Sequence, residues 1–447
     1  MTGREPPEEQ SPVARARALA KAGRTGEAAA IVGRLLKEQF GLDTTGMRIN
    51  ADIYSLNSMN GTFEAAGLPL FFKFHQEENE GVMAGEYYRA RLLADAGLPV
   101  DLPLHASTEA GRQILVYRRR TEPRFADVLR SLDVTPNVAA EAEALAAERG
   151  LNARLMEVFA RSLHPVTPEQ SAAEPIHRLF HERLVTAGAP GRLGGRFASF
   201  YEDKVFQLPG ASLDWRDLKD LTFVVNGTRY GRTLGQLFDE AFVRLRPDKL
   251  ADAGGVTAHG DAHNANVWFE KSSLAPGDSR TGSRPPGAAL VMFDPAFAGT
   301  HVPVLLAEVK TTFHNIFAHP LWLYEPDEAA GRYRADVRRD GDTLRIETDW
   351  RPGAVRLGLL QAKADQVWRP LLALLAQRGM LPPDWRRVVK LALFLCPTLV
   401  MNLRAGAEGG SHNPVSSAIG LATAASMGAE PDRADVLSEM LDAVGPD

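Results

Sequence analysis

The feature that most constrains this chain is a pair of short segments, HGDAHNANVWF at 259–269 and ALVMFDPAFAG at 289–299. In the first segment, polar side chains come immediately before an apolar run, Val267–Phe269, that is typical of a strand. In the second, the apolar run Leu290–Phe293 ends on Asp294. The two runs predict neighbouring short strands whose tips hold polar side chains close together.

Three of these polar side chains, Asp261, Asn266 and Asp294, are the types that phosphoryl transfer requires. One carboxylate can orient an acceptor hydroxyl, while an amide and a second carboxylate hold Mg²⁺ against phosphate oxygens. A hydrolytic metal site is the alternative, because His259, Asp261 and His263 are also metal ligands by type. Such sites normally take further ligands from elsewhere in the chain, and no recognisable second ligand pair is present.

Composition narrows the classes of function. The hydrophobic content of 45% and charged content of 24% are those of a globular protein, and 447 residues suit two or three domains. With a net charge of −5, the chain lacks the excess of positive charge typical of proteins that bind nucleic acid or an anionic membrane. The single cysteine, Cys396, excludes an intrachain disulfide and a Cys-rich zinc site. Without a signal-peptide pattern or a long apolar stretch, we expect a cytosolic protein.

The periodicity of apolar residues separates two kinds of structure along the chain. Strand patterns gather in the N-terminal part, and helical composition dominates after residue 125. This segregation predicts an α+β chain in two lobes rather than an alternating βαβ sheet. Helices are predicted over 125–132, 137–162 and 173–206, and hairpins where Asn-Gly and Asp-Gly occur at 226–227 and 340–341. The predicted strands of the first lobe are Met47–Leu56, Thr62–Ala66, Leu68–His75 and Gln113–Tyr117.

The spacing His-Gly-Asp-x-His-x-x-Asn at 259–266, followed by a strand that ends on an aspartate, resembles the aminoglycoside phosphotransferase and choline kinase superfamily. This resemblance implies a bilobal protein-kinase-like fold with a small β-rich N-lobe and an enlarged, mostly helical C-lobe. It also implies that Asp261 is the catalytic base, and that Asn266 and Asp294 bind Mg²⁺. His259 and His263 would brace the loop.

The same resemblance extends to the predicted N-lobe. Lys73, in the middle of the apolar run FFKF, resembles the strand lysine that contacts the α- and β-phosphates of ATP. A buried ammonium group needs a partner, and Glu86 resembles the glutamate that pairs with this lysine. Further nucleotide contacts are implied for a loop at 57–61, through Asn57, Ser58, Asn60 and Gly61, and for Val116 in the hinge segment Gln113–Thr121.

The resemblance covers residues 45–125 and 235–320 and leaves about the first 40 residues, a helical insert at 135–220 and most of the C-terminal third unplaced. We expect an N-terminal tail and helical extension at 1–44, an N-lobe at 45–120 and a C-lobe at 121–447. The insert at 135–220 and the C-terminal helices are expected to form the acceptor site. The acidic D-L-A signal of the family is replaced by a run that ends on Glu308, and Lys310 is expected on a helix surface.

The predicted protein is a kinase that moves the γ-phosphoryl group of ATP, or of GTP, to a hydroxyl of a small polar molecule. Aminoglycosides, sugars, amino-alcohols and antibiotic intermediates are all candidate acceptors, since a fold does not determine a substrate. A nucleotide-binding pseudokinase or regulatory module is a second hypothesis. A metal-dependent hydrolase is the third.

Overall fold

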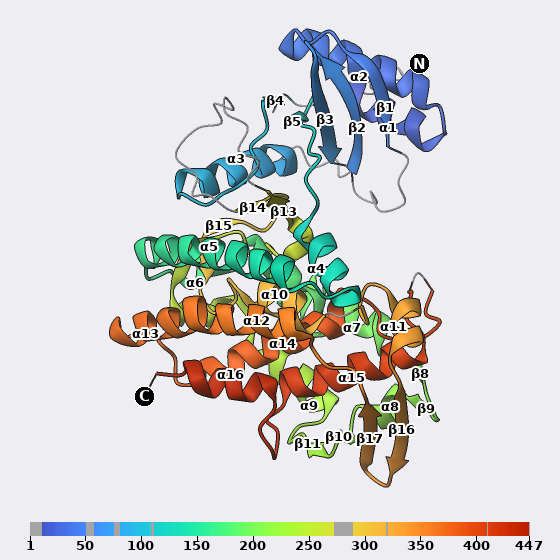
Figure 1. Ribbon diagram of the computed structural model, residues 1–447, viewed down its shortest axis with the longest axis vertical. Helices are drawn as coiled ribbons and strands as arrows, with labels where there is room; N and C mark the ends of the chain where they lie inside the picture. Colours follow the sequence, from blue (N-terminus) through green and yellow to red (C-terminus); the bar gives the residue numbers. More distant parts are fainter. Residues whose placement is uncertain are drawn as a thin grey trace, which may run out of the picture. The chain divides into compact units, whose positions relative to one another are not determined.

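The computed structural model describes residues 11–50, 58–75, 81–107, 109, 111–271, 289–318, 321–408 and 410–446; for 58, 75 and 81–87 it describes the backbone alone. The chain forms two compact units (Figure 1). Unit 1 comprises Met1–Asp95 and Val100–Thr121, and unit 2 comprises Ala96–Pro99 and Glu122–Asp447.

Unit 1 is a five-stranded antiparallel sheet with helices. The strand order is β1-β2-β3-β5-β4. The strands are β1 (Thr45–Ile49), β2 (Ser58–Ala65), β3 (Leu68–His75), β4 (His105–Ser107) and β5 (Ile114–Arg118), and the helices are α1 (Pro12–Lys21), α2 (Thr25–Phe40) and α3 (Gly81–Asp95).

Strand β3 lies at the centre of this sheet, and its side chains alternate between the two faces. Phe72 and Phe74 are fully buried in the core that α1 and α2 form with the sheet. The apolar stripe of α2, which includes Val32 and Leu36, completes that core. Lys73, between the two phenylalanines, belongs to the opposite face by this alternation and is half-buried.

The prediction of a loop at 57–61 is wrong for residues 58–61. These residues belong to β2, where they pair one by one with the C-terminal half of β3. The turn chemistry of Asn, Ser and Gly is overridden by this pairing with an apolar strand. Gly61 has a packing role, because a Cβ atom there would lie 2.2 Å from the carbonyl oxygen of Arg48. Asn57 lies outside the described residues.

Unit 2 is mostly helical. Its α-helices are α4 (Phe125–Val134), α5 (Val138–Ser162), α6 (Pro168–Ala172), α7 (Gly195–Phe200), α8 (Trp215–Leu218), α9 (Leu234–Arg244), α10 (Val309–Thr312), α11 (Pro326–Arg332), α12 (Ala354–Lys363), α13 (Arg369–Gln377), α14 (Trp385–Val400), α15 (Pro414–Gly428) and α16 (Val436–Val444). Its strands are β6 (Val185–Thr186), β7 (Ala189–Leu193), β8 (Val205–Leu208), β9 (Ala211–Asp214), β10 (Thr222–Val225), β11 (Thr228–Arg229), β12 (Gly255–Ala258), β13 (Val267–Glu270), β14 (Ala289–Met292), β15 (Gly299–Pro303), β16 (Ala335–Asp340) and β17 (Thr343–Thr348).

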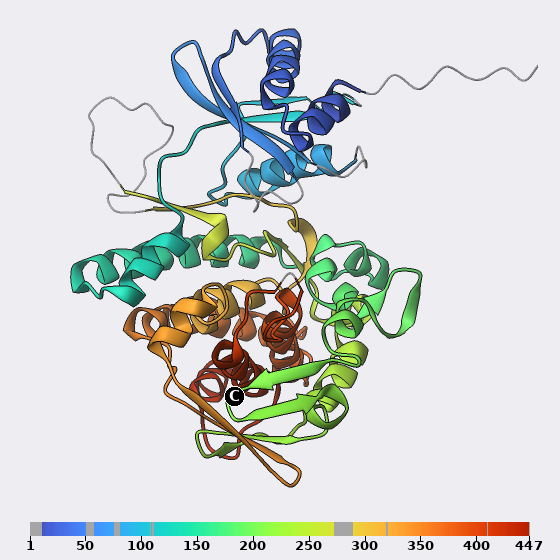
Figure 2. The same ribbon diagram turned by 90° about the vertical axis from the view of Figure 1, so that its right-hand side faces the viewer.

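The core of unit 2 is built on α14 and α15, which pack side by side (Figure 2). Both helices are buried along nearly their whole length, which explains their almost continuous apolar sequences. Cys396 lies in α14 and is buried, as its apolar neighbours predicted. Burial also raises the pKa of its thiol to about 11, so the thiol is unreactive at neutral pH. No described helix is long and apolar enough to cross a membrane.

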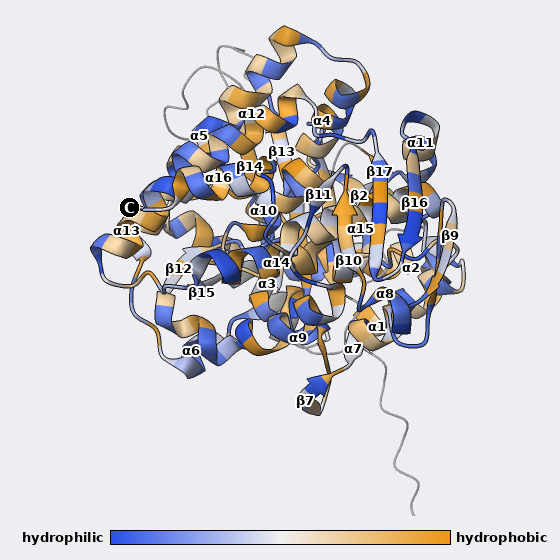
Figure 3. Cartoon of the chain, turned by 90° about the horizontal axis from the view of Figure 1, so that it is seen from below, coloured by the Kyte–Doolittle hydropathy of each residue, from blue (hydrophilic) through white to orange (hydrophobic). Residues whose placement is uncertain are grey.

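The two hairpins predicted from Asn-Gly and Asp-Gly are confirmed. Asn226 and Gly227 both have positive φ angles between β10 and β11, and Gly341 turns the chain between β16 and β17. The structure adds a parallel pairing of β10 with β17, which joins the hairpins into one four-stranded sheet. Alternating hydropathy along β17 is visible in Figure 3 and matches a strand with one buried face.

The predicted helix over 173–206 is largely wrong. The segment contains two short 3₁₀ helices, η1 (Pro175–Leu179) and η2 (His181–Arg183), followed by the β6–β7 hairpin and the short helix α7. The run AGAPGRLGG at 187–195 explains the error, because its glycines and proline break helices. The predicted α+β class, with a β-rich N-terminal part and a mostly helical remainder, is confirmed.

Candidate functional site

Pairing of β13 with β14 brings the two segments of the 259–269 and 289–299 motifs together. Val267 lies opposite Met292, so Asn266 and Phe293 are neighbours at one end of the pair. The backbone N–H of Phe293 donates to the carbonyl of Asn266 at 2.9 Å. Asn266 therefore lies at the same strand ends as Asp294, as the sequence predicted.

Asp261 lies in the loop that leads from β12 to this strand pair. The side-chain amide of Asn266 donates through Nδ2 to the backbone carbonyl of Asp261 at 3.0 Å. This bond fixes the amide so that its oxygen, Oδ1, remains available to a ligand. Asp261 is 9% exposed, and its carboxylate oxygen Oδ1 has no hydrogen-bond partner among the described residues. A buried carboxylate oxygen without a donor is rare in folded proteins and suits a group that accepts a proton.

The two histidines of the motif support the loop. His259 is buried, accepts the backbone N–H of Asp261 at Nδ1 (3.3 Å) and donates from Nε2 to the carbonyl of Phe293 (3.0 Å). Burial lowers its pKa, which favours this neutral form. Burial also lowers the pKa of His263 to about 4. With both ring nitrogens of His259 in use, the alternative of a hydrolytic site with this histidine as a ligand is not supported.

Asp294 has a left-handed backbone conformation, with a φ of 56°. Residues other than glycine rarely adopt this conformation, and such strain is concentrated at functional sites. The side chain is half-buried and is followed by Pro295. No cluster of three or more His, Cys, Asp or Glu side chains suited to a metal occurs among the described residues. A site formed by Asn266 and Asp294 would hold a metal with one amide and one carboxylate.

Lys310 is a member of the site that sequence reasoning missed. The expectation of a helix-surface residue is wrong, because Lys310 is only 3% exposed. Its Nζ lies 3.7 Å from Oδ1 of Asp261 and 2.7 Å from Nε2 of His314. The other ring nitrogen of His314 is hydrogen-bonded to the hydroxyl of Tyr324. The i, i+4 spacing of Lys310 and His314 in an apolar stretch was the available signal.

A buried ion cluster holds the start of α10, where Lys310 lies. The ammonium of Lys363 lies 2.9 Å from Glu308 and 3.2 Å from Glu148, and all three side chains are at most 3% exposed. Burial opposes the charge of Lys363, but the two carboxylates raise its pKa overall. Glu308 ends the run that replaces the acidic family signal, and it binds Lys363 and Thr311.

A second buried network supports the loop at 259–266 directly. The backbone N–H of Asn264 donates to Oδ1 of Asn315 at 2.7 Å, and Arg356 donates to the backbone carbonyl of Asn315 at 2.6 Å. Arg356 in turn forms a bidentate ion pair with Asp133 of α4, with both side chains at most 1% exposed. Asn315 thus provides a side-chain acceptor for the loop.

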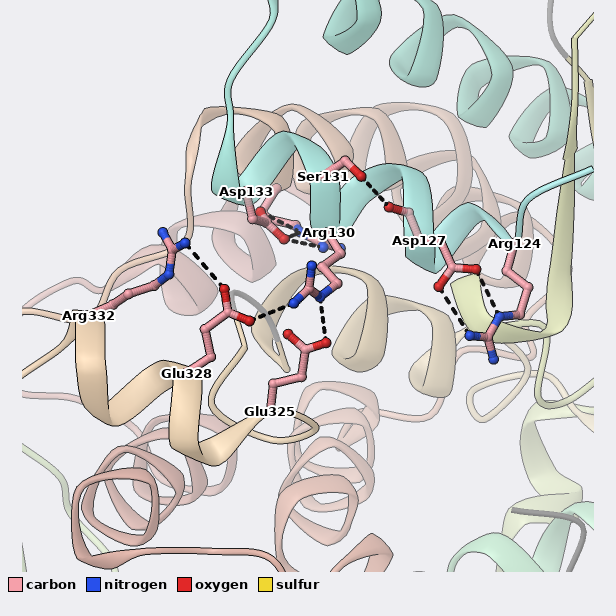
Figure 4. Close-up of polar contacts among 9 residues, drawn as sticks. Arg124, Asp127, Arg130, Ser131, Asp133, Glu325, Glu328 and Arg332 are labelled. Carbon is pink, nitrogen blue, oxygen red and sulfur yellow. Dashed lines mark hydrogen bonds and ion pairs between the residues drawn. The ribbon is translucent and has the colours of Figure 1, made fainter. Parts of the chain in front are cut away.

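The segment that carries Tyr324 is fixed to α4 by Arg130 (Figure 4). The guanidinium group of Arg130 binds Glu325 at 2.5 Å and Glu328 at 2.6 Å, and the first of these bonds raises its pKa. Because Glu325 follows Tyr324 directly, this contact restrains the end of the Lys310–His314–Tyr324 row.

The residues predicted to bind the nucleotide lie in unit 1. Lys73 in β3 is opposite Asn60 of β2, whose side-chain oxygen accepts a hydrogen bond from Asn50 at 2.7 Å. Val116 is fully buried in β5, and its carbonyl accepts the backbone N–H of Leu104. The side chains of Ser58 and Glu86 lie outside the described residues, so the pairing of Glu86 with Lys73 stays a prediction. The nucleotide contacts predicted for Asn60, Gly61 and Val116 also stay predictions.

Comparisons with known proteins give likenesses in structure alone. No family model and no curated protein matches the chain. Spectinomycin phosphotransferase APH(9)-Ia, with ADP and spectinomycin, matches at 12% identity and a TM-score of 0.32, covering 89% of this chain and 98% of that one. A thermostable mutant of aminoglycoside phosphotransferase APH(4)-Ia, in ternary complex with AMP-PNP and hygromycin B, matches at 13% identity and a TM-score of 0.40, covering 82% and 90%.

Macrolide 2′-phosphotransferase MphH from Brachybacterium faecium matches at 14% identity and a TM-score of 0.35, covering 91% of this chain and 100% of that one. Because every one of these TM-scores is below 0.5, the function proposed below is drawn from the motif and from the geometry of the site. All three of these solved structures are named as phosphotransferases.

Proposed function

We propose that this chain is a phosphotransferase that moves the γ-phosphoryl group of ATP to a hydroxyl group of a small polar molecule. Asp261 would orient the acceptor hydroxyl and accept its proton. Lys73 would contact the α- and β-phosphates, as the sequence resemblance implies. Catalysis would depend on positioning and on neutralisation of charge, as in other phosphoryl transfers.

The observation that carries the proposal is the state of the Asp261 carboxylate. It is nearly buried, and Oδ1 accepts no hydrogen bond from the described residues, although the ammonium group of Lys310 lies 3.7 Å from it. Its backbone is held by Asn266 and by His259, so the carboxylate is fixed without the use of that oxygen. A general base needs this combination of fixed position and a free lone pair.

Asn266 and Asp294 fit a bound magnesium ion by the chemistry of their donors. One amide oxygen and one carboxylate are hard ligands, and Mg²⁺ usually takes few protein ligands together with water and phosphate oxygens. The Nδ2 bond of Asn266 to Asp261 leaves the amide oxygen as the free donor. A bound Mg²⁺ would supply positive charge to the phosphate oxygens.

The structurally similar phosphotransferases act on antibiotics according to their names. The acceptor of this chain need not be an antibiotic, since a fold does not determine a substrate. ATP and GTP are both candidate donors. A pseudokinase would keep the nucleotide site and lose turnover, but Asp261, Asn266 and Asp294 are all present.

Replacement of Asp261 by alanine tests the proposal. We expect Asp261→Ala to abolish acceptor-dependent release of ADP and to leave the affinity for Mg·ATP largely unchanged, since the carboxylate acts on the acceptor. Turnover is measured by coupled ADP release over a panel of hydroxyl acceptors, and affinity by calorimetry. Asp239→Ala is the matched control, because Asp239 is exposed on α9 and outside the site. Turnover close to wild type in Asp261→Ala would remove the proposed base.

A further inference from the structure

Arg183, in the 3₁₀ helix η2 of the predicted acceptor-binding insert, has a buried guanidinium nitrogen that no described residue contacts by a hydrogen bond. Its Nη1 atom is buried and has no hydrogen-bond partner among the described residues. Burial, and then the charge of Arg196, lowers its pKa to about 10, so Arg183 remains a cation at neutral pH. Arg183 is half-buried, and burial of a guanidinium nitrogen without a compensating partner is costly.

The surroundings of Arg183 carry an excess of positive charge. Asp261 is the carboxylate whose charge acts on Arg183, and Asp261 already lies beside Lys310. Burial, and to a smaller extent the charge of Arg183, lowers the pKa of Lys310. Arg196 is satisfied separately, because its Nη1 donates to two carbonyls at the C-terminal end of α14, at 3.0 and 3.2 Å. Two guanidinium groups, Arg183 and Arg196, therefore act on one another near Asp261, and Nη1 of Arg183 has no hydrogen-bond partner among the described residues.

We propose that the phosphoryl acceptor carries an anionic group, a carboxylate or a phosphate monoester, which binds to Arg183 beside the hydroxyl that faces Asp261. The planar guanidinium of arginine matches both of these anions and forms strong charge-assisted hydrogen bonds with them. An acceptor with several ammonium groups is disfavoured, because the guanidinium groups of Arg183 and Arg196 repel it. This proposal rests on the proposed function, since it assigns the acceptor of the same site.

The test compares ligands that differ in charge and share a hydroxyl group. Binding of glycerol 3-phosphate, D-glycerate, glycerol and kanamycin is measured by calorimetry, with Mg·ADP at saturation so that the nucleotide site is filled. Wild-type protein is expected to bind the two anions more tightly than glycerol or kanamycin. Arg183→Gln is expected to weaken binding of the anions by about 10- to 100-fold, the range for a lost charge-assisted bond.

Arg192→Gln is the matched control, since Arg192 lies in the same insert and is exposed. We expect it to bind all four ligands as the wild type does. A thermal melt separates function from folding: because Nη1 of Arg183 has no hydrogen-bond partner among the described residues, Arg183→Gln should melt at the wild-type temperature or above it. The ranking of the four ligands by the wild-type protein needs no variant and stands even if Arg183→Gln fails to fold.

Tighter binding of glycerol or kanamycin than of both anions would overturn the proposal, as would anion binding that Arg183→Gln leaves unchanged. Measurement of ADP release with the same ligands distinguishes failure of the proposed function from failure of the proposed anionic acceptor. Anion binding through Arg183 with no ADP release from any acceptor would remove the proposed function and keep the anion site. ADP release that is fastest with a neutral or cationic acceptor would keep the function and refute the anionic acceptor.

Discussion

The buried ion pair between Asp133 and Arg356 supports the loop at 259–266 through Asn315. The substitution Asp133→Asn tests how much this ion pair contributes to stability. The substitution keeps the size of the side chain and removes its charge. Arg356 would remain buried with 0% exposure, no longer opposite a carboxylate and still bound to the carbonyl of Asn315. Figure 4 shows Asp133 toward one end of α4 and the exposed pair of Arg124 and Asp127 toward the other.

The expected loss in the free energy of unfolding is large because both side chains of the Asp133–Arg356 pair are buried. Two unit charges about 4 Å apart attract by about 4 kcal/mol at an effective dielectric constant of about 20. Removal of one partner from a buried pair typically costs about 3–5 kcal/mol, because the other charge remains unpaired. Arg356 is bidentate to Asp133, with contacts of 2.5–3.2 Å, so the full range applies. We expect Asp133→Asn to lower the free energy of unfolding by about 3–5 kcal/mol.

Urea unfolding at 25 °C measures this free energy, and Asp127→Asn is the control. Asp127 forms a bidentate pair with Arg124 on the same helix, but both side chains are about half exposed. Its loss should cost no more than about 1 kcal/mol. At a temperature where Asp133→Asn is folded, its kcat should also fall, since Asn315 holds the loop. Equal costs for the two variants would refute the argument from burial.

Three further predictions concern other parts of the chain. Gly61→Ala should destabilise the protein by about 1–3 kcal/mol in urea unfolding, because the new methyl group meets the backbone of Arg48, whereas Gly67→Ala tests only the loss of a glycine with positive φ. Burial lowers the pKa of His177 to about 4 from 6.5, so below pH 6.5 the unfolded state binds a proton that the folded state excludes; stability should fall by about 2 kcal/mol between pH 7.5 and 5, and His177→Gln should remove that part of the slope. The buried thiol of Cys396 should resist iodoacetamide at pH 8 in the native state and react in urea, and rapid native labelling would contradict its burial.

The sequence predicted the site best where chemistry and local pattern agree. The motif at 259–266 and the strand that ends at Asp294 each combine an apolar run with polar ends, and pairing of β13 with β14 confirms that they meet. Prediction failed where tertiary contacts override local preference. The turn-forming residues at 58–61 form a strand because they pair with the apolar strand β3. Lys310 is buried, where its Nζ lies 3.7 Å from the carboxylate of Asp261 and is hydrogen-bonded to His314.

The sequence by itself determined the α+β class, the two Asn-Gly and Asp-Gly hairpins and the candidate catalytic residues, because these depend on the order of neighbouring side chains along the chain. Only the tertiary structure decided which distant charges meet. Lys310 lies beside Asp261, and Arg356 lies between Asp133 and Asn315; the residues of these contacts are up to 223 positions apart in the sequence. Their energies depend on burial and distance, which the order of residues does not contain.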